Sequence, residues 1–210
     1  MALQLPHSQF FHLTRTGGIW VRRAIISAGI PTNEICQIET KYFYEDKHSY
    51  MLKRGTIMHM QPDELNTFGS KRFTIVRHPL NWLTSYFHFK NRLPDVWHPE
   101  RQVIDRHCAT DDFEEFIKLY VKHIPGYYTS IVKIFDRVDF IGRTENLAPD
   151  LIRILNKCGE KFDEKSILEQ KPVGVTKKTI EIPELSKKLK DKLFKVEDYV
   201  IRRYYTDGLI

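Results

Sequence analysis

The segment FFHLTRTGGIWVRRAI, residues 10–25, decides the expected fold, because two glycines in it join an apolar run to a helical pattern. The run before the glycines predicts a strand over 9–14, and the residues after them predict an amphipathic helix over 19–28. A helix N-terminus offers unpaired N–H groups, and glycine lets the backbone approach an oxyanion closely. The turn 15–18 is therefore a candidate anion site, although a pair of glycines alone favours a plain strand-to-helix turn.

Short β-rich runs alternate with helical patterns along the rest of the chain, which is typical of a sheet with crossover helices. Residues 91–110 lack periodicity and are expected to form a long loop. We expect a single α/β domain over residues 1–210, a three-layer sandwich around a central, mainly parallel sheet. Further strands are predicted at 56–60, 72–76 and 138–142, and further helices at 79–89, from a cap at Asp112, at 147–158 before Gly159, and at 183–205.

The composition is that of an ordinary soluble globular protein, with 41% hydrophobic and 29% charged residues. The net charge of +6 suggests an anionic partner. Acidic residues interleave with the basic ones in 171–195, which favours a solvated helical face over a nucleic-acid-binding stripe. We therefore expect no nucleic acid as partner. Three widely spaced cysteines and the lack of a signal peptide predict a cytoplasmic protein, and the lack of an apolar span predicts no membrane partner. The oligomeric state is not predicted.

A second motif lies in FTIVRHPLNWLTSYFHF, residues 73–89, where an apolar strand ends in Arg77 and Pro79 opens a helix. Ser85 follows Arg77 by eight positions. A cation at the carboxyl end of a strand and a hydroxyl on the following helix can converge on one phosphate, at the edge where open α/β sheets bind ligands. An arginine after a strand, taken alone, is more often a surface charge.

The turn TRTGGIW, residues 14–20, resembles the 5′-phosphosulfate loop of the sulfotransferases that use 3′-phosphoadenosine 5′-phosphosulfate (PAPS), whose pattern is close to PKTGTTW or PKTGGTS. The resemblance implies a P-loop-like nucleotide-binding fold and transfer of a sulfuryl group from PAPS. It implies that Arg15 has the catalytic role of the family's lysine, which contacts the bridging oxygen. It also implies that Trp20 stacks on adenine. The cofactor-binding residues that it implies in this loop are Arg15, Thr16, Gly17, Gly18, Ile19 and Trp20.

Two positions of this loop depart from the family pattern. Arg15 replaces a lysine, and Ile19 replaces a hydroxyl residue. Arginine can stabilise the charge that grows on a phosphate leaving group, but it cannot donate a proton, because its pKa lies above about 12. The loss of the hydroxyl at Ile19 is expected to weaken nucleotide binding.

The segment 73–89 resembles the motif with which this family binds the 3′-phosphate, and so implies that role for Arg77 and Ser85. In many members a late basic loop closes over the same phosphate. Lys177 and Lys178 in KPVGVTKK, together with Lys171, occupy that region, although a solvated loop explains them equally well.

His59, in IMHMQP after the predicted strand 56–60, is the candidate general base. Cytosolic sulfotransferases carry a catalytic histidine at a comparable strand end, followed by a proline. An imidazole with a pKa of about 6.5 can accept the proton of an acceptor hydroxyl near pH 7. Glu39 is an alternative base, and His12 and His88 are weaker candidates that we expect to be packed or surface histidines.

The segment 140–147, FIGRTENL, resembles the fourth strand of the family and the start of its helix. Thr144 stands where cytosolic members have a tyrosine that contacts adenine, and Glu145 is expected to be structural. The spacing in DRHCATDD, residues 105–112, matches no recognised metal site, so no metal is predicted.

The predicted function is transfer of a sulfuryl group from PAPS, by in-line displacement, to a hydroxyl of a glycan or of a small molecule. Two alternatives remain open. A nucleotide-dependent phosphotransferase would use a similar turn, but the chain lacks a Walker lysine and an obvious carboxylate for Mg²⁺. A non-catalytic protein that binds nucleotides or acidic glycans would keep the turn without turnover.

Overall fold

The computed structural model describes residues 2–35, 70–91, 97–100, 102–173 and 184–205. The predicted strand 56–60 lies outside these ranges. The chain divides into two compact units, which are described separately below. The first unit comprises Met1–Ile38, Thr56–His78 and Ile131–Val175, and the second comprises Glu39–Gly55, Pro79–Ser130 and Thr176–Ile210.

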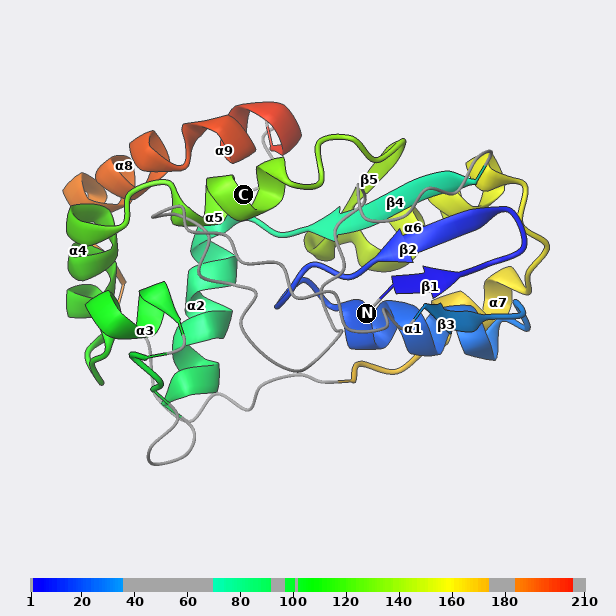
Figure 1. Ribbon diagram of the computed structural model, residues 1–210, viewed down its shortest axis with the longest axis horizontal. Coiled ribbons are helices and arrows are strands. Elements are labelled where there is room, and N and C mark those ends of the chain that lie inside the picture. The colour runs from blue at the N-terminus through cyan, green and yellow to red at the C-terminus, as the bar shows by residue number, and fades with distance from the viewer. Residues whose placement is uncertain (1, 36–69, 92–96, 101, 174–183, 206–210) are drawn as a thin grey trace. The chain divides into compact units, whose positions relative to one another are not determined.

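A five-stranded open sheet organises the first unit, in the order β3-β1-β2-β4-β5 (Figure 1). β1 is antiparallel to both β2 and β3, whereas β2, β4 and β5 are parallel neighbours. All strands except β1 therefore point the same way, which confirms the predicted α/β class and the mainly parallel sheet. The strands are β1 (Ala2–Gln4), β2 (Ser8–Phe11), β3 (Asn33–Ile35), β4 (Lys71–Val76) and β5 (Phe140–Arg143).

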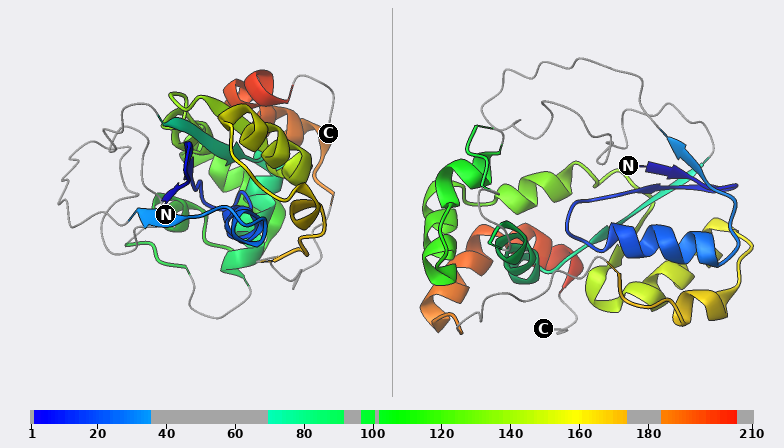
Figure 2. Two further views of the ribbon diagram at one scale, coloured as in Figure 1. Left: turned by 90° about the vertical axis from the view of Figure 1, so that its right-hand side faces the viewer. Right: turned by 90° about the horizontal axis from the view of Figure 1, so that it is seen from below.

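One face of this sheet carries the helices α1 (Gly18–Ser27), α6 (Leu147–Cys158) and α7 (Glu164–Leu168). In the right-hand view of Figure 2 the three helices lie together below the strands. Phe10 and Phe73, paired across β2 and β4, face these helices and belong to one hydrophobic core with them. Alternate residues such as Phe11 and Val76 are also buried, so both faces of the sheet are covered.

The predicted helix in 147–158 is confirmed at both ends. α6 spans Leu147–Cys158, and Gly159 follows it with φ 81°, a left-handed conformation that glycine adopts without strain. The strand before the glycine turn is shorter than predicted, since β2 ends at Phe11 and leaves residues 12–17 to the turn. This shift matters for the site, because it places His12 beyond the strand.

The second unit is helical in the part that the structure describes. Its helices are α2 (Pro79–Lys90), α3 (Val103–Cys108), α4 (Phe113–His123), α8 (Lys187–Val196) and α9 (Asp198–Tyr204), while α5 (Tyr127–Lys133) crosses from this unit into the first. Asp112 caps α4 as predicted, because its carboxylate accepts the N–H of Glu115 at 2.7 Å. The predicted loop 91–110 is wrong over α3. The predicted single helix over 183–205 is two helices.

Glu197, between α8 and α9, explains where the last helix breaks. Its side chain is fully buried and accepts hydrogen bonds from the hydroxyl of Tyr120 and from the N–H and hydroxyl of Thr129, the last two at 2.8 and 2.7 Å. Burial raises the pKa of this carboxyl, and the hydrogen bonds oppose that rise. The anchored side chain fixes the backbone at φ −108°, ψ 17°, outside the helical range.

A buried ion pair fastens α3 to α2 in the same unit. Lys90 Nζ lies 2.5 Å from Asp105 Oδ2, and the two side chains are 2% and 0% exposed. Asp105 also accepts the hydroxyl of Tyr86 at 2.6 Å and the N–H of His98 at 2.7 Å. The carboxylate is thus bound by three groups, two from α2 and one from the segment before α3, and it joins this helix pair through polar contacts.

Within the described residues, the helices are all too short or too polar to cross a lipid bilayer.

Candidate functional site

The turn between β2 and α1 has an unusual backbone. Arg15 has φ 62° and Gly17 has φ 86°, and Arg15 is the one residue other than glycine with a positive φ in the described chain. A non-glycine residue in this conformation is uncommon and costs about 1 kcal/mol or more. Gly17 is the N-cap of α1, where no side chain caps the helix and no acidic residue occupies the first turn. The first-turn N–H groups therefore remain suited to an anion.

Thr16 faces inward rather than toward a ligand. Its side chain is fully buried, and its hydroxyl donates to the carbonyl of Leu13 at 2.7 Å. Thr144 Oγ1 approaches the carbonyl oxygens of Thr16 at 2.8 Å and of Val76 at 3.0 Å, so it ties the turn to the end of β4. Thr16 and Thr144 thus hold the shape of the turn through their side chains, and Thr16 can meet a ligand only through its backbone.

Both glycines of the turn are needed for close packing. A Cβ at Gly18 would lie 1.9 Å from His12 Cδ2, and a Cβ at Gly17 would lie 3.0 Å from Leu147 Cδ2. The imidazole of His12 therefore rests against the first residue of α1. This contact explains structurally why position 18 is a glycine, in addition to the predicted approach of the backbone to an oxyanion. It also agrees with the expectation that His12 is packed.

Trp20 and Ile19 lie differently from each other at the start of α1. Trp20 is 8% exposed within the hydrophobic core, and its Nε1–H donates to the carbonyl of Gln170 at 3.1 Å. The predicted stacking of Trp20 on adenine receives no support from this position. Ile19 is 53% exposed, so the residue that replaces the family hydroxyl presents an apolar surface beside the turn.

Arg77 connects the second motif to the first. β2 and β4 are parallel neighbours, so their carboxyl ends lie at one edge of the sheet. Arg77, the residue after β4, donates from Nη1 to the carbonyl oxygen of Arg15 at 3.1 Å, across a sequence separation of 62 residues. The two arginines that the motifs single out are therefore joined at one sheet edge.

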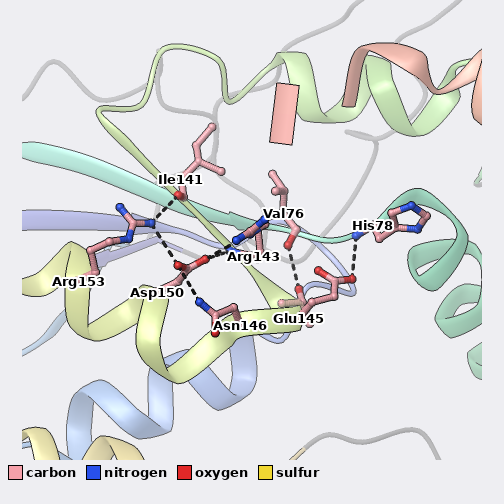
Figure 3. Close-up of polar contacts among 9 residues, drawn as sticks. Val76, His78, Ile141, Arg143, Glu145, Asn146, Asp150 and Arg153 are labelled. Carbon is pink, nitrogen blue, oxygen red and sulfur yellow. Dashed lines mark hydrogen bonds and ion pairs between the residues drawn. The ribbon is translucent and has the colours of Figure 1, made fainter. Parts of the chain in front are cut away.

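The segment after β5 borders the same edge (Figure 3). Glu145 Oε1 accepts the N–H of His78 at 2.9 Å, and this contact bears out the structural role expected for Glu145. Asp150 on α6 accepts the N–H of Arg143 at 2.7 Å and fixes the end of β5. Burial lowers the pKa of His78, and the charge of Glu145 opposes that shift.

His78 is a titratable residue at this edge that the sequence analysis did not single out. Its position directly after Arg77 and before Pro79 was the signal that could have found it. The imidazole is 5% exposed in the described structure. It therefore contributes to the packing of the strand end rather than to an open surface.

The remaining predicted residues belong to the second unit, to the segment after α7, or to ranges outside the described residues. Ser85 lies half-buried on α2 in the second unit, and its convergence with Arg77 stays a prediction. His88, on the same helix, is buried as expected, and Lys171 is exposed after α7. The base candidates His59 and Glu39 lie outside the described residues, as do Lys177 and Lys178.

The described surface has a shallow hollow in each unit. One follows α8 and is discussed below. The other lies between α1 and the segment after α7, with Arg23, Ser27, Glu169 and Lys171 among its lining residues. Among the described residues, no group of histidine, cysteine and acidic side chains has the arrangement of a metal site.

Comparisons of the chain with protein-family models, with curated proteins and with solved structures found no match.

Replacing Arg77 with alanine is expected to weaken the binding of adenosine 3′,5′-bisphosphate by roughly 2–4 kcal/mol, because a charge-assisted partner of a partly buried phosphate is lost. Isothermal titration calorimetry measures the dissociation constant. Arg72→Ala is the matched control, since Arg72 lies at the opposite end of the same strand and pairs with Asp139. An unchanged dissociation constant in the Arg77 variant would contradict the assignment.

Proposed function

We propose that this chain is a PAPS-dependent sulfotransferase with a P-loop-like, three-layer α/β fold. One observation carries the proposal: Arg77 Nη1 donates to the Arg15 carbonyl, so the two candidate nucleotide motifs meet at the carboxyl ends of adjacent parallel strands. A 5′-phosphosulfate group at the α1 N-terminus and a 3′-phosphate near Arg77 would then be held by one sheet edge. The uncapped, acid-free first turn of α1 supports the placement of an anion there.

The reaction that this arrangement would support is a direct in-line displacement. The acceptor oxygen attacks sulfur and forms a new S–O bond while the bond from sulfur to the bridging oxygen breaks. His59 takes the proton of the acceptor hydroxyl, and the departing electron pair stays on the phosphate of adenosine 3′,5′-bisphosphate. Arg15 and the first-turn N–H groups of α1 stabilise that growing charge.

An arginine suits this leaving group. A phosphate ester oxygen is weakly basic, so it needs its charge stabilised more than it needs a proton. The guanidinium of Arg15 supplies charge and several N–H donors but no transferable proton. The left-handed backbone of Arg15 fixes where that side chain leaves the turn.

Adenosine 3′,5′-bisphosphate is expected to raise the melting temperature, whereas ATP with Mg²⁺ at the same concentration raises it much less. The reason is that Arg77 and Ser85 are proposed to bind a 3′-phosphate, and a ligand that binds only the native state stabilises it by mass action. Differential scanning fluorimetry measures both shifts. Equal stabilisation by the two nucleotides would favour a phosphotransferase instead.

A second experiment separates an enzyme from a binding protein. Radiolabelled sulfate transfer from PAPS is measured with pooled hydroxylic acceptors, including carbohydrates. Transfer to a pool that is lost in an Arg15→Ala variant supports the proposal. Tight binding of the bisphosphate with no transfer to any pool would favour a non-catalytic nucleotide-binding protein.

A further inference from the structure

Helix α8 carries lysines that line one open hollow of the surface of the second unit. The apolar side of the helix is buried through Leu189 and Leu193, and α8 packs against α4. The hollow is lined by Lys187, Lys188, Asp191, Lys192 and Lys195, all of them exposed. The four lysines are named here the α8 lysine face.

Among the described residues, the acidic side chains next to α8 in the sequence make contacts elsewhere, although they interleave with the lysines in the sequence. Glu184 binds Lys190 at 2.9 Å. Glu197 is buried against other helices, and Asp198 binds Arg202 at 2.7 Å on α9. Asp191 is the one acidic residue among those that line the hollow. The basic and acidic residues that alternate in the sequence therefore do not alternate on this surface. The α8 lysine face has an excess of positive charge.

The charge is also arranged at a cost to the helix. Lys187 and Lys188 occupy the first turn of α8, which contains no acidic residue, so they oppose the positive end of the helix dipole. Lys188 and Lys192 are separated by four positions, where like charges destabilise a helix. Within the described ranges, no ion pair joins a lysine of the face to a carboxylate. Asp191, four positions from both Lys187 and Lys195, offsets part of this cost. The charge that remains uncompensated, at the first turn above all, is one that an external anion would stabilise.

We propose that the α8 lysine face binds an acidic, carboxylate-rich segment of a partner protein. The face extends over about 12 Å between Lys187 and Lys195, at 1.5 Å per residue, which matches about two turns of a partner helix. It presents no arginine and no aromatic ring, the groups that stack on the bases of nucleic acids. The apolar side of α8 is buried, so the helix cannot insert into a membrane surface.

Asp191 supports the choice of a protein partner over a uniform polyanion. It lies among the lysines and repels any anion that is charged evenly along its length. A protein segment can place carboxylates opposite the lysines and a cation or neutral residue opposite Asp191. The inference is independent of the proposed sulfotransferase activity, because it uses no residue of the β2–α1 turn.

The test uses fluorescence polarisation of a labelled peptide of about twelve residues, rich in glutamate with single interspersed glutamines, against the full chain. The variant Lys188→Glu, Lys192→Glu, Lys195→Glu is expected to lose at least about tenfold in affinity, because attraction becomes repulsion. Asp191→Asn is expected to strengthen binding. Circular dichroism shows that the variants keep their helices, as expected for exposed positions.

The charge-matched control is the variant Lys133→Glu, Lys157→Glu, Lys161→Glu, which changes three exposed lysines of the first unit. It is expected to change peptide affinity less than about twofold. Equal losses in the two triple variants would overturn the proposal, because net charge alone would then explain binding. A DNA duplex, or phosphatidylcholine vesicles with phosphatidylserine, bound more tightly than the peptide by the same face would overturn the class of partner. Absence of peptide binding at low salt would overturn it as well.

Discussion

Replacing Asp105 with alanine is expected to lower the free energy of unfolding by about 3–5 kcal/mol, because it leaves the buried ammonium of Lys90 without its counter-charge. Lys90 and Asp105 are 2% and 0% exposed, so water cannot take the place of the lost carboxylate without structural change. The substitution also removes the acceptor of the His98 N–H and one of the two acceptors of the Tyr86 hydroxyl, the other being Gln102. Urea denaturation, followed by circular dichroism, measures the loss.

The controls separate a broken buried pair from the general value of an ion pair. Lys118 and Glu114 form a pair of exposed side chains on α4, and Glu114→Gln is expected to leave the free energy of unfolding nearly unchanged. The double variant Lys90→Met, Asp105→Leu is expected to recover much of the loss, because both charges are then gone. If Asp105→Ala behaved like Glu114→Gln, Lys90 would have to reach solvent, and the pair would not fasten α3 to α2.

Burial also changes the chemistry of the groups around this pair. Burial, together with the nearby charge of Asp105, raises the pKa of Cys108 to about 12. A thiol with so high a pKa is protonated at neutral pH and is a poor nucleophile. Cys108 is therefore a packing residue of α3.

The elements that the sequence predicted best are those with local end signals. Pro79 is the first residue of α2, Asp112 directly precedes α4 and caps it, and Gly159 directly follows α6. Such signals act over a few residues, so they can be read without knowledge of the fold. The apolar centre of β4 had the same local character.

The elements that the sequence missed depend on distant contacts. β1 and β3 have three residues each and α7 has five, too few to show a period. α3 lies in a stretch without periodicity and is fixed by Asp105, which binds a lysine 15 positions earlier. The last helix breaks at Glu197 because that side chain is bonded to Tyr120, 77 positions away. These contacts override local propensity, and only the folded chain shows them.

The candidate site also has features that could be predicted from the sequence and features that depend on distant contacts. Because β2 and β4 are parallel neighbours, the glycine turn and Arg77 follow them at one sheet edge, and this arrangement could be expected from the order of the elements. The inward orientation of Thr16 and the burial of Trp20 could not, because both depend on which core the side chain meets. A family pattern fixes residue types at positions, whereas packing decides which of their groups remain available.

Replacing His59 with alanine is expected to lower the rate of sulfuryl transfer by about 10²–10⁴-fold, the usual cost of losing a general base. The affinity for adenosine 3′,5′-bisphosphate is expected to stay nearly unchanged, since the proposed base meets the acceptor hydroxyl and no phosphate. Single-turnover transfer, calorimetry and melting temperature are measured on one preparation, with an acceptor identified by the radiolabel screen.

The comparison with other histidines makes this test specific. His7→Ala is the matched control, because His7 is exposed in the turn before β2, at the opposite end of the strand from His12. A histidine with a packing role would lower melting temperature, binding and turnover together, as expected for His78, which is buried. Full activity in a folded His59→Ala variant would contradict the assignment of the base. Glu39 and then His12 would next be substituted by alanine. The variant that loses transfer but keeps bisphosphate binding would identify the group that takes the proton.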